Sequence, residues 1–154
     1  MNRKKKKKMH TKPRELPNHM ILLNPFSKKS LSPEDFDQAK NNGILAVDCS
    51  WKTAEEQFFD LSKNHKSRAL PFVIAVNPVN FGKPLQLTTL EAFIAAVYIL
   101  GDKNQAEKLT SLYKWSPHFL TMNKNPLDDY QSAKNSHEVI HKMHQYLPND
   151  KDEI

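Results

Sequence analysis

Apolar runs divided by polar segments predict that this chain alternates between strands and helices. Residues 20–23, 44–47 and 72–76 form three short, almost wholly apolar runs. Runs of this length fit buried strands, and the lack of alternation in residues 72–76 is typical of a central parallel strand covered on both faces. Strands that alternate with helical segments predict an α/β fold built on a mostly parallel sheet flanked by helices.

Capping residues mark the helix boundaries between and after these runs. Start signals occur at Ser32-Pro33, Thr53-Ala54-Glu55-Glu56, Thr88-Thr89-Leu90-Glu91, Asp102, Ser116-Pro117 and Asn125-Pro126, and stop signals occur at Gly43 and Gly101. The helix after Thr88 is expected to present one apolar face, formed by Leu90, Phe93, Ile94, Val97 and Tyr98. In total we expect three to five strands and five or six helices.

A length of 154 residues fits a single domain. We expect residues 1–19 to form a basic, flexible arm, residues 20–132 to form the folded domain, and residues 133–154 to form a polar C-terminal helix or tail. Residues 62–69 are polar and basic, and we expect them to form an exposed loop before the third strand.

The positive charge of the chain suits a polyanionic partner. The formal net charge is +6 and the isoelectric point is near 9.3, which fits binding to RNA, although lysine runs are also found as plain solvated tails. The side chains expected to contact RNA are Lys4, Lys5, Lys6, Lys7, Lys8, Lys63, Lys66 and Arg68.

Cysteine content and hydropathy indicate an intracellular protein. Cys49 is the only cysteine, so no intrachain disulfide can form. No apolar run reaches the roughly 20 residues that span a bilayer. We expect a cytoplasmic monomer that uses no membrane and no metal, with residues 3–8 as a candidate nuclear address in a eukaryote.

Two polar segments follow predicted strands and are the strongest candidates for a ligand site. Asp48-Cys49-Ser50-Trp51 follows the second run, and Asn77-Pro78-Val79-Asn80-Phe81-Gly82 follows the third. Open α/β sheets bind ligands at the carboxyl ends of their strands. Taken alone, Asp48 also fits a helix cap, and Trp51 also fits a core aromatic residue.

Other motifs carry weaker signals. His137-Glu138-Val139-Ile140-His141 matches the zinc motif H-E-x-x-H, but position 147 is Leu147 and no third ligand is evident, so a surface helix is the better interpretation. Cys49 has no histidine near it in sequence and fits a buried apolar position better than a nucleophile. Three scattered glycines cannot build a phosphate-binding loop.

The whole stretch from about residue 20 to residue 130 resembles the small-subunit ribosomal RNA aminocarboxypropyltransferases. The segments that carry the resemblance are Leu22-Leu23-Asn24-Pro25, Leu31-Ser32-Pro33-Glu34-Asp35, residues 43–51, Arg68-Ala69-Leu70-Pro71, residues 77–84, Leu87-Thr88-Thr89-Leu90-Glu91-Ala92, residues 95–99, Tyr113-Lys114-Trp115 and Phe119-Leu120-Thr121-Met122-Asn123. They occur in unbroken order, so the match is specific.

The resemblance implies a knotted, SPOUT-like α/β fold and a role in ribosome biogenesis. It further implies transfer of the 3-amino-3-carboxypropyl group of S-adenosylmethionine to N3 of a modified uridine, N1-methylpseudouridine or pseudouridine, in small-subunit rRNA. Trp51 would lie against the sulfonium and cover its methyl group, and Asp48 would accept a hydrogen bond or proton from the uridine. The cofactor-binding positions that it implies are Thr11, Leu23, Pro25, Val47, Trp51, Leu70, Leu85 and Thr89.

The sequence departs from the family at two places. Family members usually have an aromatic residue where Leu85 stands, which a main-chain contact tolerates. An aspartate- and cysteine-containing strand and a cofactor-contacting threonine normally precede the core, and here Thr11 is the substitute. Two alternatives therefore remain: a noncatalytic RNA-binding assembly factor, and a SPOUT-type rRNA methyltransferase.

Overall fold

A small parallel sheet lies at the centre of one half of the molecule. The computed structural model describes residues 17–48 and 52–148. Within them, β1 (Ile21–Leu23), β2 (Ile44–Leu45) and β3 (Lys66–Arg68) pair in the order β2-β1-β3, and both pairings are parallel. The α/β class with a mostly parallel sheet is therefore confirmed.

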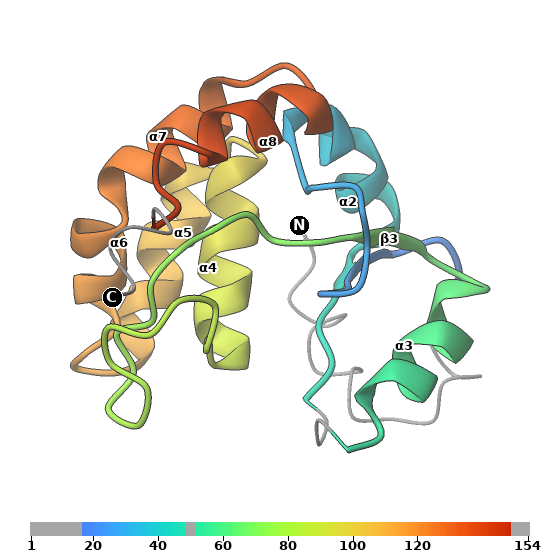
Figure 1. The fold of residues 1–154 in the computed structure, drawn as a ribbon, viewed down its shortest axis with the longest axis horizontal. Helices are drawn as coiled ribbons and strands as arrows, with labels where there is room; N and C mark the ends of the chain where they lie inside the picture. Colours follow the sequence, from blue (N-terminus) through green and yellow to red (C-terminus); the bar gives the residue numbers. More distant parts are fainter. Residues whose placement is uncertain (1–16, 49–51, 149–154) are drawn as a thin grey trace.

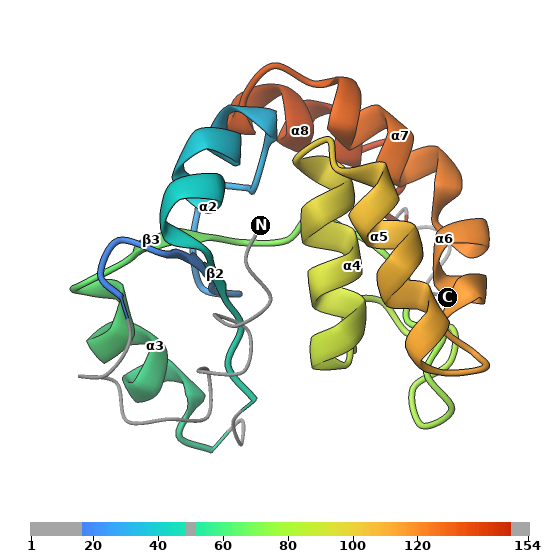
Figure 2. The ribbon, with the colours of Figure 1, turned by 180° about the vertical axis from the view of Figure 1, so that it is seen from behind.

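Helices cover this sheet and extend away from it. They are α2 (Phe36–Asn42), entered through a 3-10 turn at Pro33–Asp35, α3 (Ala54–Ser62), α4 (Thr89–Ile99), α5 (Lys103–Leu109), α6 (Pro117–Met122), α7 (Lys124–Ser132) and α8 (Ser136–Met143). Helices α4 to α8 gather on one side of the molecule, and the sheet lies with α2 and α3 on the other (Figures 1 and 2). Helix α8 reaches back to α2, so the two sides are joined at one end.

The predicted position of the third strand was wrong. Residues 62–69 were expected to be an exposed loop, yet Lys66–Arg68 forms β3, with Ile21 opposite Lys66 and Leu23 opposite Arg68. Residues 72–76 run beside the helices instead, and contribute one isolated antiparallel bridge, between Ile74 and Pro84. Strand β3 lies at an edge of the sheet and carries polar side chains, so no apolar run marks it in the sequence.

Residues 72–76 pair through the main chain with residues 82–85, where the Ala75 N–H donates to Lys83 O at 3.0 Å, and side chains satisfy other main-chain groups of the segment. The Ile74 N–H donates to Asn123 Oδ1 at 2.8 Å, and the Val76 N–H donates to Glu91 Oε2 at 2.7 Å. Val73 and Val76 are buried. The apolar run therefore identified a buried segment correctly but not its partner, since apolarity reports burial and not the source of the hydrogen bonds.

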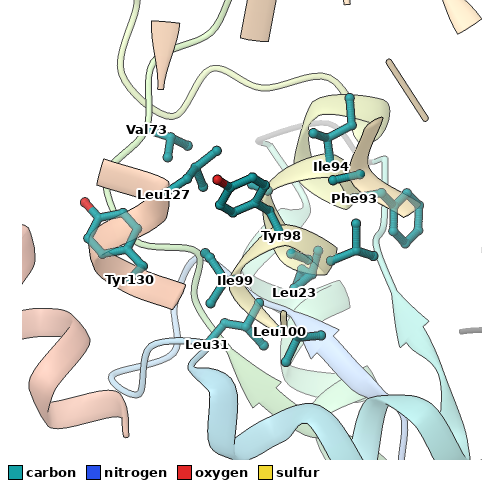
Figure 3. Packing of buried hydrophobic residues seen from close by; sticks show 14 of the residues in the cluster. Leu23, Leu31, Val73, Phe93, Ile94, Tyr98, Ile99, Leu100, Leu127 and Tyr130 are labelled. Carbon is teal, nitrogen blue, oxygen red and sulfur yellow. The ribbon is translucent and has the colours of Figure 1, made fainter. Parts of the chain in front are cut away.

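Helix α4 is the centre of the larger core. Every residue from Phe93 to Ile99 is buried. Helix α4 is therefore buried on all sides over this range, and not only on the one apolar face that the sequence predicts. Tyr98 and Ile99 pack near Leu31, Leu127 and Tyr130 (Figure 3). A second cluster, Met20, Leu22, Leu45, Ala54 and Phe58, lies between the sheet and α3. The sheet is thus covered on both faces, as parallel sheets usually are.

The predicted helix starts at Thr88, Asp102 and Ser116 are confirmed in position, although Ser116 makes no side-chain cap. The start predicted at Asn125-Pro126 is wrong, because α7 begins at Lys124 with Asn123 as its N-cap. Thr88 Oγ1 accepts from the Glu91 N–H at 3.2 Å, and Asp102 Oδ1 accepts from the Gln105 N–H at 3.0 Å. Thr53 starts α3 without a side-chain cap, so its predicted capping box is wrong. At Ser32 the cap works in one direction, since the Ser32 N–H donates to Asp35 at 3.2 Å while Ser32 Oγ has no partner.

The C-terminal helix is part of the packed structure. Val139 of α8 belongs to the main core, and Ser136 Oγ accepts from the Ser30 N–H at 2.8 Å. Near the start of the described chain, the His19 N–H donates to Asn64 O at 2.7 Å. Among the described residues, no helix has the length and apolar content needed to cross a bilayer.

Candidate functional site

A pocket of about 440 Å³ opens between the carboxyl ends of β1 and β2 and the start of α4. Its walls come from three parts of the chain: the strand ends, α3, and the segment that enters α4. The lining residues are Leu23, Asn24, Pro25, Ala46, Val47, Asp48, Ala54, Phe58, Ala69, Leu70, Leu85, Leu87, Thr88, Thr89 and Ala92. Small-molecule sites usually measure roughly 300–1,000 Å³, so the size fits one ligand.

Six positions predicted to contact a cofactor lie around this one pocket. They are Leu23, Pro25, Val47, Leu70, Leu85 and Thr89. The other two, Thr11 and Trp51, lie outside the described residues. Because these six come from segments up to 66 residues apart in sequence numbering (23 to 89), their assembly at one pocket does not follow from proximity in the chain.

Asp48 places an exposed carboxylate at the edge of the pocket. It follows β2, where the strand has already ended at Leu45 rather than at Val47 as predicted. Ala46 and Val47 are thereby released from the sheet and line the pocket. Cys49, Ser50 and Trp51 lie outside the described residues, so the predicted pairing of Asp48 with Trp51 stays a prediction.

The buried carboxylate of Glu91 holds one wall of the pocket in place. Oε1 accepts from Asn77 Nδ2 at 2.7 Å and from the Thr88 N–H at 2.9 Å, and Oε2 accepts from the Val76 N–H at 2.7 Å. Glu91 is fully buried, so these donors replace the water that a carboxylate would otherwise bind. The side chain therefore ties the end of the 72–76 segment to the first turn of α4.

Leu85 adopts a backbone conformation that is rare for its residue type. Its φ is 57°, in the left-handed region, and its N–H donates to Val73 O at 2.9 Å. A leucine there costs about 1–2 kcal/mol relative to the right-handed conformation. Strain of this kind is often found where a backbone must present its polar groups to a ligand, and Leu85 lines the pocket.

The second polar segment, residues 77–82, supports the pocket from behind rather than lining it. Asn77 is buried, and its Nδ2 also donates to Gln86 O at 3.1 Å. Gly82 has a φ of 81°, which permits the turn, and its N–H donates to Ala75 O at 2.8 Å. The segment was correctly recognised as unusual, but its described polar groups serve the fold of the wall.

The basic residues before β3 differ in their exposure. Lys63 and Lys66 are exposed, as expected for RNA contacts, and Lys63 pairs with Asp60 at 3.6 Å. Arg68 contradicts the exposed loop: its side chain is 11% exposed, and its Nε lies 3.1 Å from Asp35 Oδ1. Burial raises the pKa of Asp35, while the Arg68 guanidinium and the Ser32 N–H oppose the rise. Lys4, Lys5, Lys6, Lys7 and Lys8 lie outside the described residues.

The H-E-x-x-H match is an ordinary helical segment. Glu138 Oε2 accepts from the Lys134 N–H at 3.2 Å, and the Glu138 N–H donates to the N-cap residue Asn135 at 2.9 Å. In the part of the chain that the structure describes, no group of three metal-ligating side chains is present.

Sequence reasoning missed several pocket residues that do not resemble ligands. Asn24 is buried, and its Nδ2 donates to Ser67 Oγ at 3.1 Å, which fixes the end of β1 against β3. Phe58 reaches the pocket from α3. The Asn24-Pro25 step was the available signal for Asn24, since it follows an apolar run in the same way as Asp48. For Phe58 the sequence offered no signal beyond an apolar helical residue.

Apolar walls with a few polar groups suit a nucleoside-containing cofactor. Leu23, Leu70 and Leu87 can cover a flat ring, while Thr89 adds a polar side chain and the exposed Asp48 favours a positive charge nearby. The fold and site define an α/β protein that has its ligand pocket at the carboxyl ends of parallel strands.

The chain belongs to the family described as "Ribosome biogenesis protein, C-terminal", whose model matches residues 21–147. A 16S rRNA aminocarboxypropyltransferase from Methanococcoides burtonii is 49% identical over 137 residues, which are 88% of this chain and 78% of that protein. The 16S rRNA aminocarboxypropyltransferase of Methanocaldococcus jannaschii is 47% identical over 135 residues, 88% of this chain and 78% of that protein.

A solved structure also matches. The SAM-dependent rRNA:acp-transferase Tsr3 from Vulcanisaeta distributa aligns with a TM-score of 0.76 at 35% identity, over 88% of this chain and 79% of that chain. The family resemblance stated from the sequence is therefore confirmed.

Proposed function

We propose that this protein transfers the 3-amino-3-carboxypropyl group of S-adenosylmethionine to N3 of a modified uridine, N1-methylpseudouridine or pseudouridine, in small-subunit rRNA. The observation that carries the proposal is the convergence of Leu23, Pro25, Val47, Leu70, Leu85 and Thr89 on one pocket beside Asp48. The names of the relatives support the transfer of an aminocarboxypropyl group to 16S rRNA, and the solved relative supports its dependence on S-adenosylmethionine.

The residues have separate roles in this proposal. Leu23 and Pro25 pack on the adenine, and the main chain at Val47, Leu70, Leu85 and Thr89 grips the adenosine. The proposed fold around this grip is SPOUT-like and knotted, which is consistent with walls drawn from distant parts of the chain. When bound, the cofactor supplies a sulfonium with three carbons open to attack, and attack at the aminocarboxypropyl carbon forms the N3–C bond, breaks the C–S bond and releases methylthioadenosine.

Asp48 and Trp51 then decide how the reaction proceeds. The uridine nitrogen must lose its proton as it attacks. Asp48 accepts a hydrogen bond from N3–H and then takes up that proton or passes it to solvent. An exposed aspartate is a weak base, so orientation of the uridine is its main contribution. In this proposal the Trp51 indole would cover the methyl carbon of the sulfonium and would thereby direct attack to the aminocarboxypropyl carbon.

Labelled cofactor tests the proposal directly. The full chain is incubated with unmodified small-subunit RNA and with S-adenosylmethionine labelled either in the carboxyl carbon or in the methyl carbon. Carboxyl label should enter the RNA and methyl label should not. Methyl label in RNA would assign a methyltransferase instead, and no transfer with no cofactor binding by calorimetry would assign a noncatalytic assembly factor.

A matched pair of variants locates the chemistry. Asp48→Asn should lower the transfer rate by about 10²-fold, because loss of the charged acceptor weakens the hydrogen bond that orients the uridine, with little change in cofactor affinity. Asp37→Asn, which alters an exposed carboxylate on α2, should leave the rate unchanged. Equal rates for both variants would remove Asp48 from the mechanism.

A further inference from the structure

Two stacked aromatic pairs meet near the start of α6, one of them completed by Phe81 from the 77–82 segment. Tyr113 stacks on Trp115 with ring centroids 5.5 Å apart and an interplanar angle of 3°. Phe81 stacks on His118 with centroids 5.9 Å apart and an angle of 8°. The Trp115 carbonyl accepts from the His118 N–H at 3.2 Å, so the two pairs share one turn of chain. We call these four residues the aromatic platform.

Phe81, Tyr113 and His118 of the platform are exposed, while Trp115 is half-buried and packs against the main core. Tyr113 is 58% exposed and Phe81 is 56% exposed, and the neighbouring apolar residues Val79 and Leu112 are 84% and 61% exposed. Isolated exposed apolar residues need no explanation, but a group of them on one surface marks an interaction site.

The platform is held rigidly although it comes from two distant segments. Asn123, at the end of α6, accepts from the Ile74 N–H at 2.8 Å and donates to Ile74 O at 2.9 Å. The loop that carries Phe81 is closed by the Gly82 N–H donating to Ala75 O at 2.8 Å, and by Asn77 Oδ1 accepting from the Asn80 N–H at 2.9 Å. The rings are therefore presented without the cost of ordering the loop on binding.

Charge favours RNA as the partner of this surface over an apolar protein segment. The sequence has no Asp or Glu from residue 61 to residue 90, or from residue 108 to residue 127, which include both platform segments. Lys83 and Lys114 are exposed within these segments. Exposed parallel rings flanked by lysines are what unpaired bases require, since every base has a flat face that stacks on Phe, Tyr, Trp or His while the phosphates meet positive charge.

The platform also leads into the pocket. Phe81 and Lys83 precede Leu85, which lines the pocket, and Figures 1 and 2 show the 77–84 loop on the same edge of the molecule as the first turn of α4. We propose that Phe81, Tyr113, Trp115 and His118 stack unpaired bases of the substrate RNA outside the pocket. The proposal rests on the proposed function only for the identity of that RNA.

Removal of the two most exposed rings tests the platform. The full chain carrying Phe81→Ala and Tyr113→Ala is titrated against a short labelled single-stranded RNA and against a fully paired RNA duplex. The Kd for the single strand should rise about tenfold or more, because one stacked base contributes that much or more. The slope of log Kd against log salt should stay unchanged, because no charge is removed, and the Kd for the duplex should change less than twofold.

Matched variants separate stacking from loss of apolar surface. Val79→Ala with Leu112→Ala removes exposed apolar side chains from the same surface but keeps every ring, and Phe59→Ala removes an exposed ring on α3. Both controls should bind the single strand as the wild type does, and Tyr113→Phe should retain binding because the ring remains. An unchanged Kd in the double-ring variant would overturn the proposal and favour a protein partner. An equal loss in the Val79/Leu112 control would overturn it by showing that apolar contact, and not ring stacking, binds the RNA.

Tryptophan emission gives an independent readout. The chain has two tryptophans, so Trp51→Phe leaves Trp115 as the sole indole. The single-stranded RNA should quench its emission, and lack of quenching under saturating RNA would contradict stacking at Tyr113 and Trp115. Cofactor binding and label transfer are measured on the chain that keeps Trp51. Failure of transfer there, with intact quenching in Trp51→Phe, would reject the proposed function and keep the platform, and the converse would reject the platform alone.

Discussion

The carboxylate of Glu91 accepts a hydrogen bond from the main-chain N–H of Val76 at 2.7 Å. The same carboxylate accepts from Asn77 and Thr88. One buried side chain thus joins the segment behind the pocket to the helix turn that forms the pocket wall, and it does so without contributing to the pocket surface.

Glu91→Gln should weaken both the fold and the cofactor site. The amide keeps the size of the side chain but turns one acceptor oxygen into a donor that faces other donors, so folding stability should fall by about 1–3 kcal/mol. Affinity for S-adenosylmethionine should fall about tenfold as Thr88 and Thr89 shift. Thermal unfolding and calorimetry measure the two effects. Glu107→Gln, on the exposed face of α5, is the control and should change neither.

Substitutions at Leu85 should separate its backbone from its side chain. Leu85→Gly should raise stability by about 1 kcal/mol, because glycine adopts a positive φ without strain. Leu85→Val should lower stability, since β-branched residues are strongly disfavoured there. If the main chain makes the contact, the glycine variant should bind cofactor within about threefold of the wild type. A tenfold loss with glycine would assign the contact to the leucine side chain.

The ion pair between Arg68 and Asp35 should give a distinctive pH dependence. Arg68→Met should cost about 3 kcal/mol at pH 7, because it leaves the buried Asp35 carboxylate without its partner. The folded-state pKa of Asp35 is already raised by burial, so a fall in pH protonates Asp35 in the folded chain before the unfolded chain and favours folding. Loss of the Arg68 charge raises that pKa further.

The stability deficit of Arg68→Met should therefore shrink between pH 7 and pH 4, as followed by thermal unfolding. Lys63→Met breaks an exposed pair with Asp60 and should cost less than about 1 kcal/mol at every pH. A deficit for Arg68→Met that is constant with pH would show that lost packing, and not the charge on Asp35, causes the effect.

Trp51→Ala should weaken cofactor binding by about tenfold, since it removes a large apolar surface and a cation–π contact with the sulfonium. Trp115→Ala should leave cofactor affinity unchanged and weaken binding of single-stranded RNA. Calorimetry with S-adenosylmethionine and titration with RNA give the two affinities. Unchanged cofactor affinity in Trp51→Ala would place Trp51 in the core instead.

Replacement of Lys4, Lys5, Lys6, Lys7 and Lys8 by glutamine should weaken RNA binding and flatten its salt dependence. Each lost phosphate contact should reduce the slope of log K against log salt by about 0.7–0.9. The substitution of Lys63 and Lys66 by glutamine removes two charges from the folded domain and should flatten the slope less than the loss of the five arm lysines. A slope that stays the same after loss of the five lysines would show that the arm does not contact RNA.

The sequence predicted those parts of the fold that depend on local chemistry. Thr88, Asp102, Gly43 and Gly101 bound helices as expected, because each acts through hydrogen bonds or backbone angles within a few residues. The strand at Lys66–Arg68 was not predictable in this way. Its polar residues form a strand only because they pair with the free edge of β1. Strand β1 lies more than 40 residues earlier in the chain, so no local pattern reveals the pairing.

The candidate site shows the same division. The six cofactor positions came from a resemblance across many segments, and their meeting at one pocket required the three-dimensional structure. The role of Glu91 was read only as a local capping residue, since its second partner, Val76, lies 15 residues away. Arg68 lies in a polar, basic segment and was therefore expected to be exposed. Its ion-pair partner, Asp35, precedes it by 33 residues, so the sequence gives no local sign of the pairing.

The hydrogen bond from Ser30 to Ser136 spans 106 residues of the chain. Strand β1 likewise receives both of its neighbours from later sequence. Contacts of such long range form late in folding, because a large loop must close first. During synthesis every residue that lines the pocket has been made once Ala92 is in place, whereas the bond between Ser30 and Ser136 must wait for a further 44 residues. The docking of α8 therefore comes after the pocket residues are already available.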